Sequence, residues 1–156
     1  MNIRLATPVN SLLLSSLNID VQRLHAEQHP EFFKMPTRDD FAASFFDEML
    51  ANPVVSIFIA EEDREALGYI VCKLMERTEN PFTFGMRYLL IDQISVRPQA
   101  RGRGVGTALM KQAEILAGEL GVQKIWLDSW GFNGNAHAFF EGAGFMKFMH
   151  RFWKEL

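Results

Sequence analysis

The amino-acid sequence predicts an α/β fold in which one mixed, largely antiparallel central sheet has helices on both faces. Leu89 to Val96 is apolar enough for an interior strand, and a helical pattern from Val105 to Leu120 follows it closely. Two further strand-like runs, residues 54–61 and 67–77, are joined by a polar turn typical of a hairpin. The 156 residues are expected to form one domain, 1–156, with a core of its own.

The N-terminal third is expected to hold a short edge strand, residues 2–6, followed by two helices. The first helix begins after Asn10, which can cap its N-terminus. The second begins at Thr37, which has the spacing of a capping box with Asp40, and ends at Asn52. The expected buried stripes are Leu13, Leu17, Val21 and Leu24 in the first helix, and Phe41, Phe45 and Met49 in the second.

The C-terminal third is expected to hold a strand over 124–130, a helix over 135–143 and a last strand over 146–153. The apolar side chains of this last strand belong to the core, or to a dimer surface if its outer face is exposed. The order of elements is β-α-α-β-β-β-α-β-α-β, which fits an α/β sandwich.

Composition excludes several classes of protein. The net charge is −3 and the pI about 5.8, so nothing indicates a partner that is a nucleic acid. No apolar run approaches the roughly 20 residues of a membrane span, and the N-terminus lacks the pattern of a signal peptide. The single cysteine, Cys72, excludes an internal disulfide and lies in phase with Ile70 and Leu74, as a core residue would. We therefore expect a cytoplasmic protein.

The turn between the central strand and helix has the composition of a phosphate-binding loop. Residues 99–106 hold three glycines and two arginines, and they end at a helix N-terminus, where free N–H groups and the helix dipole favour anions. The turn fits neither the P-loop nor the G-x-G-x-x-G dinucleotide fingerprint. The alternative is a glycine-rich turn with solvated arginines.

Two motifs resemble those of a known family. Arg101-x-x-Gly104-x-Gly106, after a strand ending at Val96, resembles the acyl-CoA signature of the GNAT superfamily of acetyl-CoA-dependent N-acetyltransferases. A second block agrees with it: Asn133-x-x-Ala136-x-x-Phe139-Phe140-x-x-x-Gly144-Phe145. The resemblance implies the GNAT fold, in which the sheet splays between the strands at 87–96 and 124–130 to admit the cofactor.

The same resemblance implies which residues bind acetyl-CoA. Ile94, Ser95 and Val96 would bind the pantetheine arm through their backbone, and Asn133 either contacts the cofactor or caps its helix. No metal is implied. The other residues expected at the cofactor are Arg101, Gly102, Arg103, Gly104, Val105, Gly106, Thr107 and Phe140.

Acetyl transfer to an amine needs a base, because a lysine-like amine has a pKa of about 10.4 and must lose a proton before it attacks. Asp92 is the candidate, since a carboxylate that interrupts an apolar strand is costly unless it has a role. It also matches the position at which many family members carry an acidic residue. The alternative is a structural aspartate that pairs with an arginine or caps a bulge.

Phe140 departs from the family pattern, in which a tyrosine at this position protonates the leaving thiolate. Phenylalanine has no proton to give. His137 and Tyr88 are possible replacements, or the thiolate leaves unassisted.

The sequence therefore predicts an N-acetyltransferase that acts on a primary amine of a small molecule or peptide, by direct attack in a ternary complex. The alternative is an acyl-CoA-binding sensor or regulatory module that lacks the acid. His25 and His29 have a spacing that metal ligands use, but no third ligand is evident. The segment 29–33 is expected to line the acceptor pocket, where Glu27 and Glu31 would meet a cation.

Overall fold

The computed structural model describes all 156 residues and contains one five-stranded sheet. The strands lie in chain order, and the first four are antiparallel neighbours, whereas β5 runs parallel to β4. The strands are β1 (Asn2–Leu5), β2 (Val55–Glu62), β3 (Glu65–Arg77), β4 (Met86–Val96) and β5 (Ile125–Leu127). The predicted mixed and largely antiparallel sheet is confirmed.

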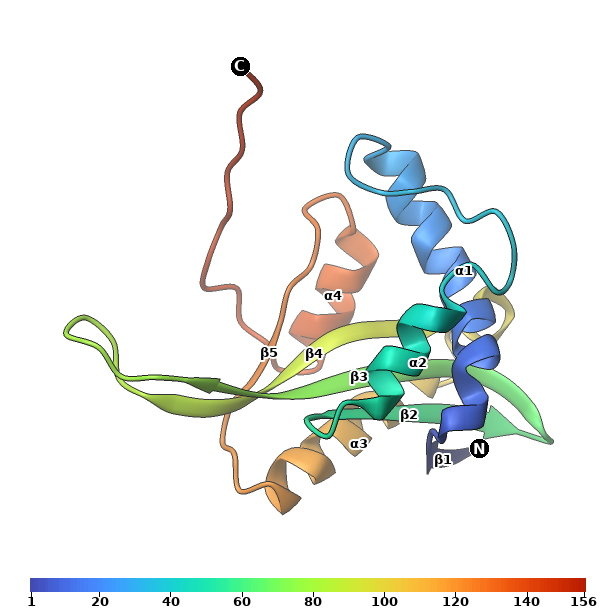
Figure 1. Ribbon diagram of the computed structural model, residues 1–156, viewed down its shortest axis with the longest axis horizontal. Helices are drawn as coiled ribbons and strands as arrows, with labels where there is room; N and C mark the ends of the chain where they lie inside the picture. The colour runs from blue at the N-terminus through green and yellow to red at the C-terminus, as the bar shows by residue number, and fades with distance from the viewer.

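Helices cover both faces of the sheet, as predicted (Figure 1). One face carries α1 (Ser11–Gln28) and α2 (Ala43–Ala51), and the other carries α3 (Val105–Glu119). The fourth helix, α4 (Gly134–Gly142), follows β5, and its Phe140 packs into the core on the α3 side. Short 3-10 turns at Pro8–Asn10 and Pro98–Ala100 precede α1 and the glycine-rich turn.

The period-two alternation of the strands divides the core into two layers. On β3, Tyr69 and Val71 face α1 and α2, whereas Ile70 and Cys72 face α3. Cys72 is fully buried, which confirms its predicted place in the core.

A β-bulge interrupts this alternation on β4. Val71 of β3 lies opposite Gln93, but the next residue, Cys72, lies opposite Ile91, so that Asp92 is the additional residue. Because a bulge places two successive residues against one partner, the side chains of Asp92 and Gln93 both come to the face that carries α1.

The sheet opens just beyond the bulge. β5 pairs with β4 only from Leu89 to Ile91, and its own pairing ends at Leu127. From residue 92 to residue 96 the edge of β4 on that side therefore has no neighbouring strand, and its backbone groups there are available to a ligand. This confirms the predicted splay, although β5 is shorter than the predicted strand over 124–130.

Two expectations for the helices were wrong. The second helix begins at Ala43 rather than at Thr37, because Asp40 binds Arg38 through two hydrogen bonds of 2.8 Å instead of closing a capping box. In that helix Phe45 is 51% exposed, and Phe46 occupies the core in its place.

The stripe predicted for the first helix is also only partly right. Leu17 is buried, as is Leu14, but Val21 and Leu24 are half-buried because the second half of α1 rises away from the sheet (Figure 1).

The predicted last strand is absent. Phe145 packs against the core, but residues 146–153 pair with no strand, and the chain leaves the body as an extended tail (Figure 1). Its Phe152 is 91% exposed. None of the helices is both long and apolar enough to cross a bilayer.

Candidate active site

The glycine-rich turn connects the free edge of β4 to the N-terminus of α3. Pro98 opens the 3-10 turn, after which Gly102 and Gly104 adopt left-handed conformations with φ of 74° and 80°. A side chain would strain these two positions, which accounts for both glycines. Gly104 is the N-cap of α3, and the first-turn N–H groups of α3 have no helical carbonyl to bind. The turn therefore presents backbone donors at the positive end of a helix dipole.

The third glycine has a packing role. A Cβ on Gly106 would come within 3.1 Å of the Phe139 ring of α4, so the absence of a side chain lets α4 approach α3 closely. Alongside this contact, α3 and α4 line an open pocket of about 320 Å³ whose wall includes Thr107. The pocket is thus adjacent to the N-terminal turn of α3.

The two arginines of the turn are exposed but differ in their partners. Arg101 donates from Nε to the Val96 carbonyl at 3.3 Å, which holds it against the end of β4. Arg103 forms an ion pair with Glu62, a carboxylate that also accepts from the N-terminal amine at 3.2 Å. An anion in the turn would compete with Glu62 for Arg103.

The residues of the splay present backbone rather than side chains. Ser95 is buried, and its hydroxyl donates to the Leu17 carbonyl at 2.9 Å. Ile94 from β4 and Leu127 from β5 pack on the core cluster that contains Phe140, which is only 9% exposed. Phe140 therefore belongs to the core cluster on the α3 side of the sheet, the same cluster that β4 and β5 contact at the splay.

At the bulge, Asp92 Oδ1 lies 2.9 Å from Nζ of Lys73 on the neighbouring strand. The two side chains are 26% and 27% exposed, so the pair is accessible to solvent from the α1 side. The partner of Asp92 is thus a lysine and not the arginine that was the expected structural alternative. Asp92 is at the same time the extra residue of the bulge.

A partly buried polar network next to Asp92, centred on the buried Tyr69, was not predicted from the sequence. The Tyr69 hydroxyl donates to Gln93 Oε1 at 2.7 Å and accepts from Asn18 Nδ2 at 2.6 Å. Burial raises the pKa of Tyr69, the Asp92 carboxylate raises it further, and the hydrogen bond from Asn18 acts in the opposite direction. The available signal was the second polar residue, Gln93, beside Asp92 in an otherwise apolar strand.

The polar side chains near α4 form hydrogen bonds with backbone groups. Asn133 caps α4, because its side-chain oxygen accepts from the Ala136 N–H at 3.2 Å. His137 Nε2 lies 3.0 Å from the Trp130 carbonyl, so the nitrogen donates and the oxygen accepts. Tyr88 stacks on Trp126 of β5, with ring centroids 4.3 Å apart. His137 and Tyr88, the possible replacements for the missing tyrosine acid, are therefore both engaged in other contacts.

An aromatic cluster connects the far end of α1 to the loop that follows β5. His25 stacks on Phe33 at 4.9 Å and meets Phe132 edge-on at 5.6 Å, while Phe33 meets Trp130 at 4.8 Å. Burial and the neighbouring His29 lower the pKa of His25. We call His25, His29, Phe32, Phe33, Trp130 and Phe132 the aromatic cluster.

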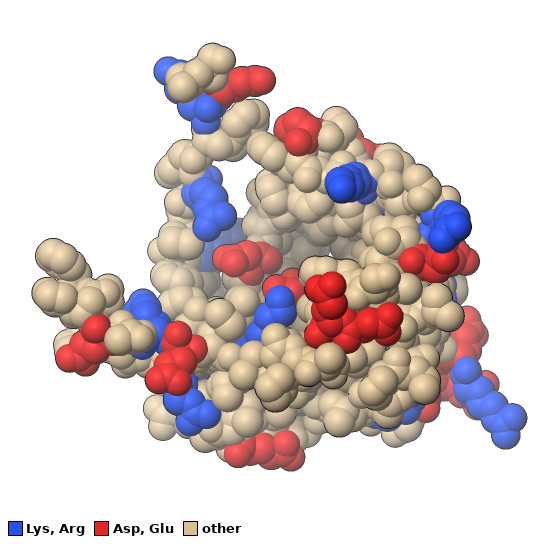
Figure 2. Space-filling model, in the orientation of Figure 1, with Lys and Arg blue, Asp and Glu red and all other residues tan.

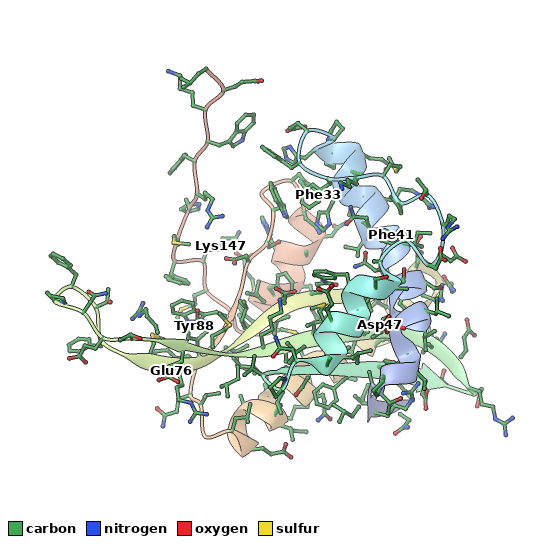
Figure 3. The ribbon with its side chains drawn as sticks, in the orientation of Figure 1. Phe33, Phe41, Asp47, Glu76, Tyr88 and Lys147 are labelled. Atoms are coloured by element: carbon green, nitrogen blue, oxygen red, sulfur yellow. The ribbon has the colours of Figure 1, made fainter.

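The two histidines of the cluster bind partners other than a metal. His29 Nδ1 lies 2.9 Å from Glu31, and His25 is engaged with aromatic rings. No group of three or more His, Cys, Asp or Glu side chains is placed to hold a metal ion. Segment 29–33 lies at the top of α1, where Phe33 points toward the loop before α4 (Figure 3).

Comparison with known proteins identifies this arrangement. The model of the acetyltransferase (GNAT) family matches residues 19–145. An uncharacterized N-acetyltransferase of Bacillus subtilis, YhfO, is 28% identical over 145 residues, which are 93% of this chain and 89% of that protein.

Solved structures share the fold. The BH1408 protein of Bacillus halodurans, solved as a tetramutant, has a TM-score of 0.93 with 21% identity, and each chain is covered completely. The aminoglycoside N-acetyltransferase AAC(6')-Iy, solved with CoA, has a TM-score of 0.76 with 18% identity over 99% of this chain and 93% of that one. The segment matched by the family model contains the bulge, the splay, the glycine-rich turn and α4, and the chain belongs to the acetyltransferase (GNAT) family.

Proposed function

We propose that this protein transfers the acetyl group of acetyl-CoA to a primary amine of a small molecule or peptide by direct attack in a ternary complex. The observation that carries the proposal is the course of β4. Its unpaired edge begins at the Asp92 bulge and leads, four residues later, into the glycine-rich turn. One strand thus joins a carboxylate, an open row of backbone groups and an anion-binding helix N-terminus.

The residues fit acetyl-CoA as a co-substrate. A Cβ built on Gly102 or Gly104 meets no atom within 4 Å, so the space over the turn is open to a pyrophosphate. Arg101 and Arg103 supply charge, and the first-turn N–H groups at Val105, Gly106 and Thr107 supply donors. We assign the pantetheine arm to the backbone of Ile94, Ser95 and Val96. We place Phe140 and Asn133 along its other side.

In the reaction, the ammonium group of the acceptor first gives a proton to Asp92, directly or through a water. The neutral nitrogen then attacks the thioester carbonyl and forms the N–C bond, and as the C–S bond breaks the nitrogen loses its second proton to solvent, which leaves the neutral amide. Backbone N–H groups of the β4 edge stabilise the oxyanion, and the thiolate takes a proton from solvent because Phe140 has none to give.

A second function, an acyl-CoA-binding sensor or regulatory module, is favoured by one observation. The position expected to hold the acid is a phenylalanine that is part of the core. Such a module would bind acetyl-CoA but would release no thiol with any amine.

The testing experiment measures thiol release from acetyl-CoA against pooled polyamines, aminoglycosides, amino acids, arylalkylamines and short peptides. Release with one pool supports the enzyme and gives its substrate class. Absence of release with every pool, while acetyl-CoA still raises the melting temperature, would favour the binding module. Because Cys72 carries the chain's only thiol, a Cys72→Ser variant controls for its reaction with the reagent.

The cofactor site is tested by Gly104→Glu. A carboxylate at the N-cap lies where the pyrophosphate is proposed to bind, and we expect acetyl-CoA affinity to fall below detection by calorimetry. The control is Gly118→Glu, an exposed glycine near the other end of the same helix, with open space around its Cβ position. Unchanged affinity of Gly104→Glu would refute the placement.

We further propose that the protein is cytoplasmic and forms a homodimer through its tail. The single cysteine is free and buried, which suits a reducing compartment.

The tail exposes Phe148 (71%) and Phe152 (91%), and the outer edge of β5 has no partner strand. A second copy carries the same tail and the same edge, so reciprocal pairing would cover both. Light scattering should give twice the chain mass, and Phe148→Asp with Phe152→Asp should give the monomer; a wild-type monomer would refute the dimer.

A further inference from the structure

We propose that the acceptor is a primary amine carried on an aromatic or similarly flat apolar body, and that the aromatic cluster binds this body. The inference rests on the proposed function and names its substrate class. The aminoglycoside acetyltransferases that share the fold are named for substrates of a different chemistry, polyhydroxylated and polycationic.

The cluster stands over the splay from both sides. Asn18 of α1 contacts Gln93 next to the bulge, and His25 lies two helical turns farther along, or about 10 Å. On the other side, Trp130 follows the last paired residue of β5, Leu127, by three residues, again a reach of about 10 Å. The two walls meet where Phe33 contacts Trp130. An amine at Asp92 would therefore have its body within reach of these rings.

Two of the six rings are exposed in the free protein, although Phe32 also meets Trp153 of the tail edge-on at 5.5 Å. Phe32 is 50% exposed and Trp130 is 40% exposed, although both are large and apolar. Exposed apolar rings that are grouped next to a reaction centre indicate a ligand that covers them, since scattered exposure would need no explanation. Flat rings offer stacking and edge contacts to an aromatic ligand, and cation–π attraction to its ammonium group.

Three carboxylates, at the bulge, in segment 29–33 and on α4, already have basic partners. Asp92 binds Lys73 and Glu31 binds His29, both at 2.9 Å. Glu141 of α4 binds Lys147 at 2.8 Å. A polycation would have to displace these partners one after another, whereas a monoamine needs only one carboxylate.

Acidic side chains outside the aromatic cluster would attract a cationic substrate. Acidic side chains gather over α2 on the face shown in Figure 2, and Asp47 is among the exposed ones (Figure 3). The acidic patch brings a positive amine to this face, and the rings then select its body.

The test compares 2-phenylethylamine with ethylamine, which keeps the amine and lacks the ring, and with spermidine and kanamycin. We expect kcat/KM from thiol release to be at least about tenfold higher for the ring-bearing amine than for each of the others. The binding of 2-phenylethylamine to the protein saturated with CoA is measured in parallel by calorimetry.

Alanine substitutions in the aromatic cluster test whether these rings bind the body of the amine. Trp130→Ala and Phe32→Ala should each raise KM for 2-phenylethylamine about tenfold, with the KM for acetyl-CoA unchanged. The two are tested independently, so that a failure of one to fold leaves the other. The matched control is Phe82→Ala, a 94% exposed ring in the hairpin between β3 and β4, and it should change neither constant.

The outcomes separate the two proposals. A higher kcat/KM for spermidine or kanamycin overturns the aromatic acceptor and leaves the acetyltransferase standing. Binding of 2-phenylethylamine that weakens in Trp130→Ala, without thiol release from any amine, supports the ligand class and refutes the enzyme. If the ring-bearing amine is neither bound nor acetylated, this inference is overturned.

Discussion

Replacing Asp92 with asparagine separates catalysis from structure at the bulge. The substitution keeps the size of the side chain and an oxygen that can accept from Lys73, but it removes the negative charge that would take the amine proton. Since Asp92 and Lys73 are both about one-quarter exposed, loss of the charge pair should cost roughly 1 kcal/mol or less. For a chain of this length, that lowers the melting temperature by about 2–4 °C.

The expected loss of rate is much larger. A positioned general base contributes typically about 10²–10⁴ to a reaction, so kcat at pH 7 should fall about 100-fold or more. Acetyl-CoA affinity should remain unchanged, because the cofactor residues lie from Ile94 onward. Without a base, the rate should follow the fraction of neutral amine and rise about tenfold for each pH unit below the amine pKa near 10.4.

Lys73→Met is the matched control. It removes the same ion pair and should lower the melting temperature by a similar amount, but it leaves the carboxylate in place, and kcat should stay within a few-fold of the wild type. The assay is thiol release with the best amine of the screen, run beside a thermal melt. If Asp92→Asn keeps kcat within about threefold at pH 7, Asp92 has a structural role only and the proposed proton transfer is wrong.

Three further variants test other contacts. Tyr69→Phe removes the hydroxyl that donates to Gln93 and accepts from Asn18. Because Asn18 still donates to Gln93 Oε1 at 3.3 Å, the cost should be about 0.5–1.5 kcal/mol in urea denaturation at pH 7. Because burial raises the pKa of Tyr69, the stabilising effect of its hydroxyl is complete below pH 10 and declines above it. The difference in free energy of unfolding between the wild type and Tyr69→Phe should therefore become smaller above pH 10. Glu62→Gln frees Arg103 and should tighten acetyl-CoA binding up to about fivefold in low-salt calorimetry. Phe140→Tyr should raise kcat if an acid at this position is limiting; an unchanged kcat would show unassisted departure of the thiolate.

The fold was predictable because its central elements have strong local patterns. The apolar run at 89–96, the glycine-rich turn and the heptad-like spacing of α3 each indicate one structure, and together they indicate a strand, a turn and a helix in contact. The start of α2 was not predictable in this way. Arg38 and Asp40 bind each other, and a side-chain pair two residues apart is not distinguishable from a capping box by spacing alone.

The parts of the candidate site that depend on backbone conformation could be predicted from the sequence. Gly102 and Gly104 are required by positive φ, which sequence analysis can infer from a glycine-rich turn at a helix start. Tyr69 was not found, since a tyrosine in an apolar strand is most simply a core residue, and its partners come from α1 and β4. Only the bulge, which shifts Gln93 to the α1 face, brings the three polar groups together.

The absent last strand is informative because its sequence still has the pattern of one. Residues 146–153 are rich in aromatic and apolar side chains, and an extended chain places Phe148 and Phe152 on one side and Met149 and Trp153 on the other. Phe148 contacts Trp126 of β5 and Trp153 contacts Phe32, but the backbone of the segment has no strand partner. Its expected partner, the outer edge of β5, is also unpaired. The chain therefore has both a strand-like segment and a sheet edge that remain unpaired, and reciprocal pairing between two copies would satisfy both.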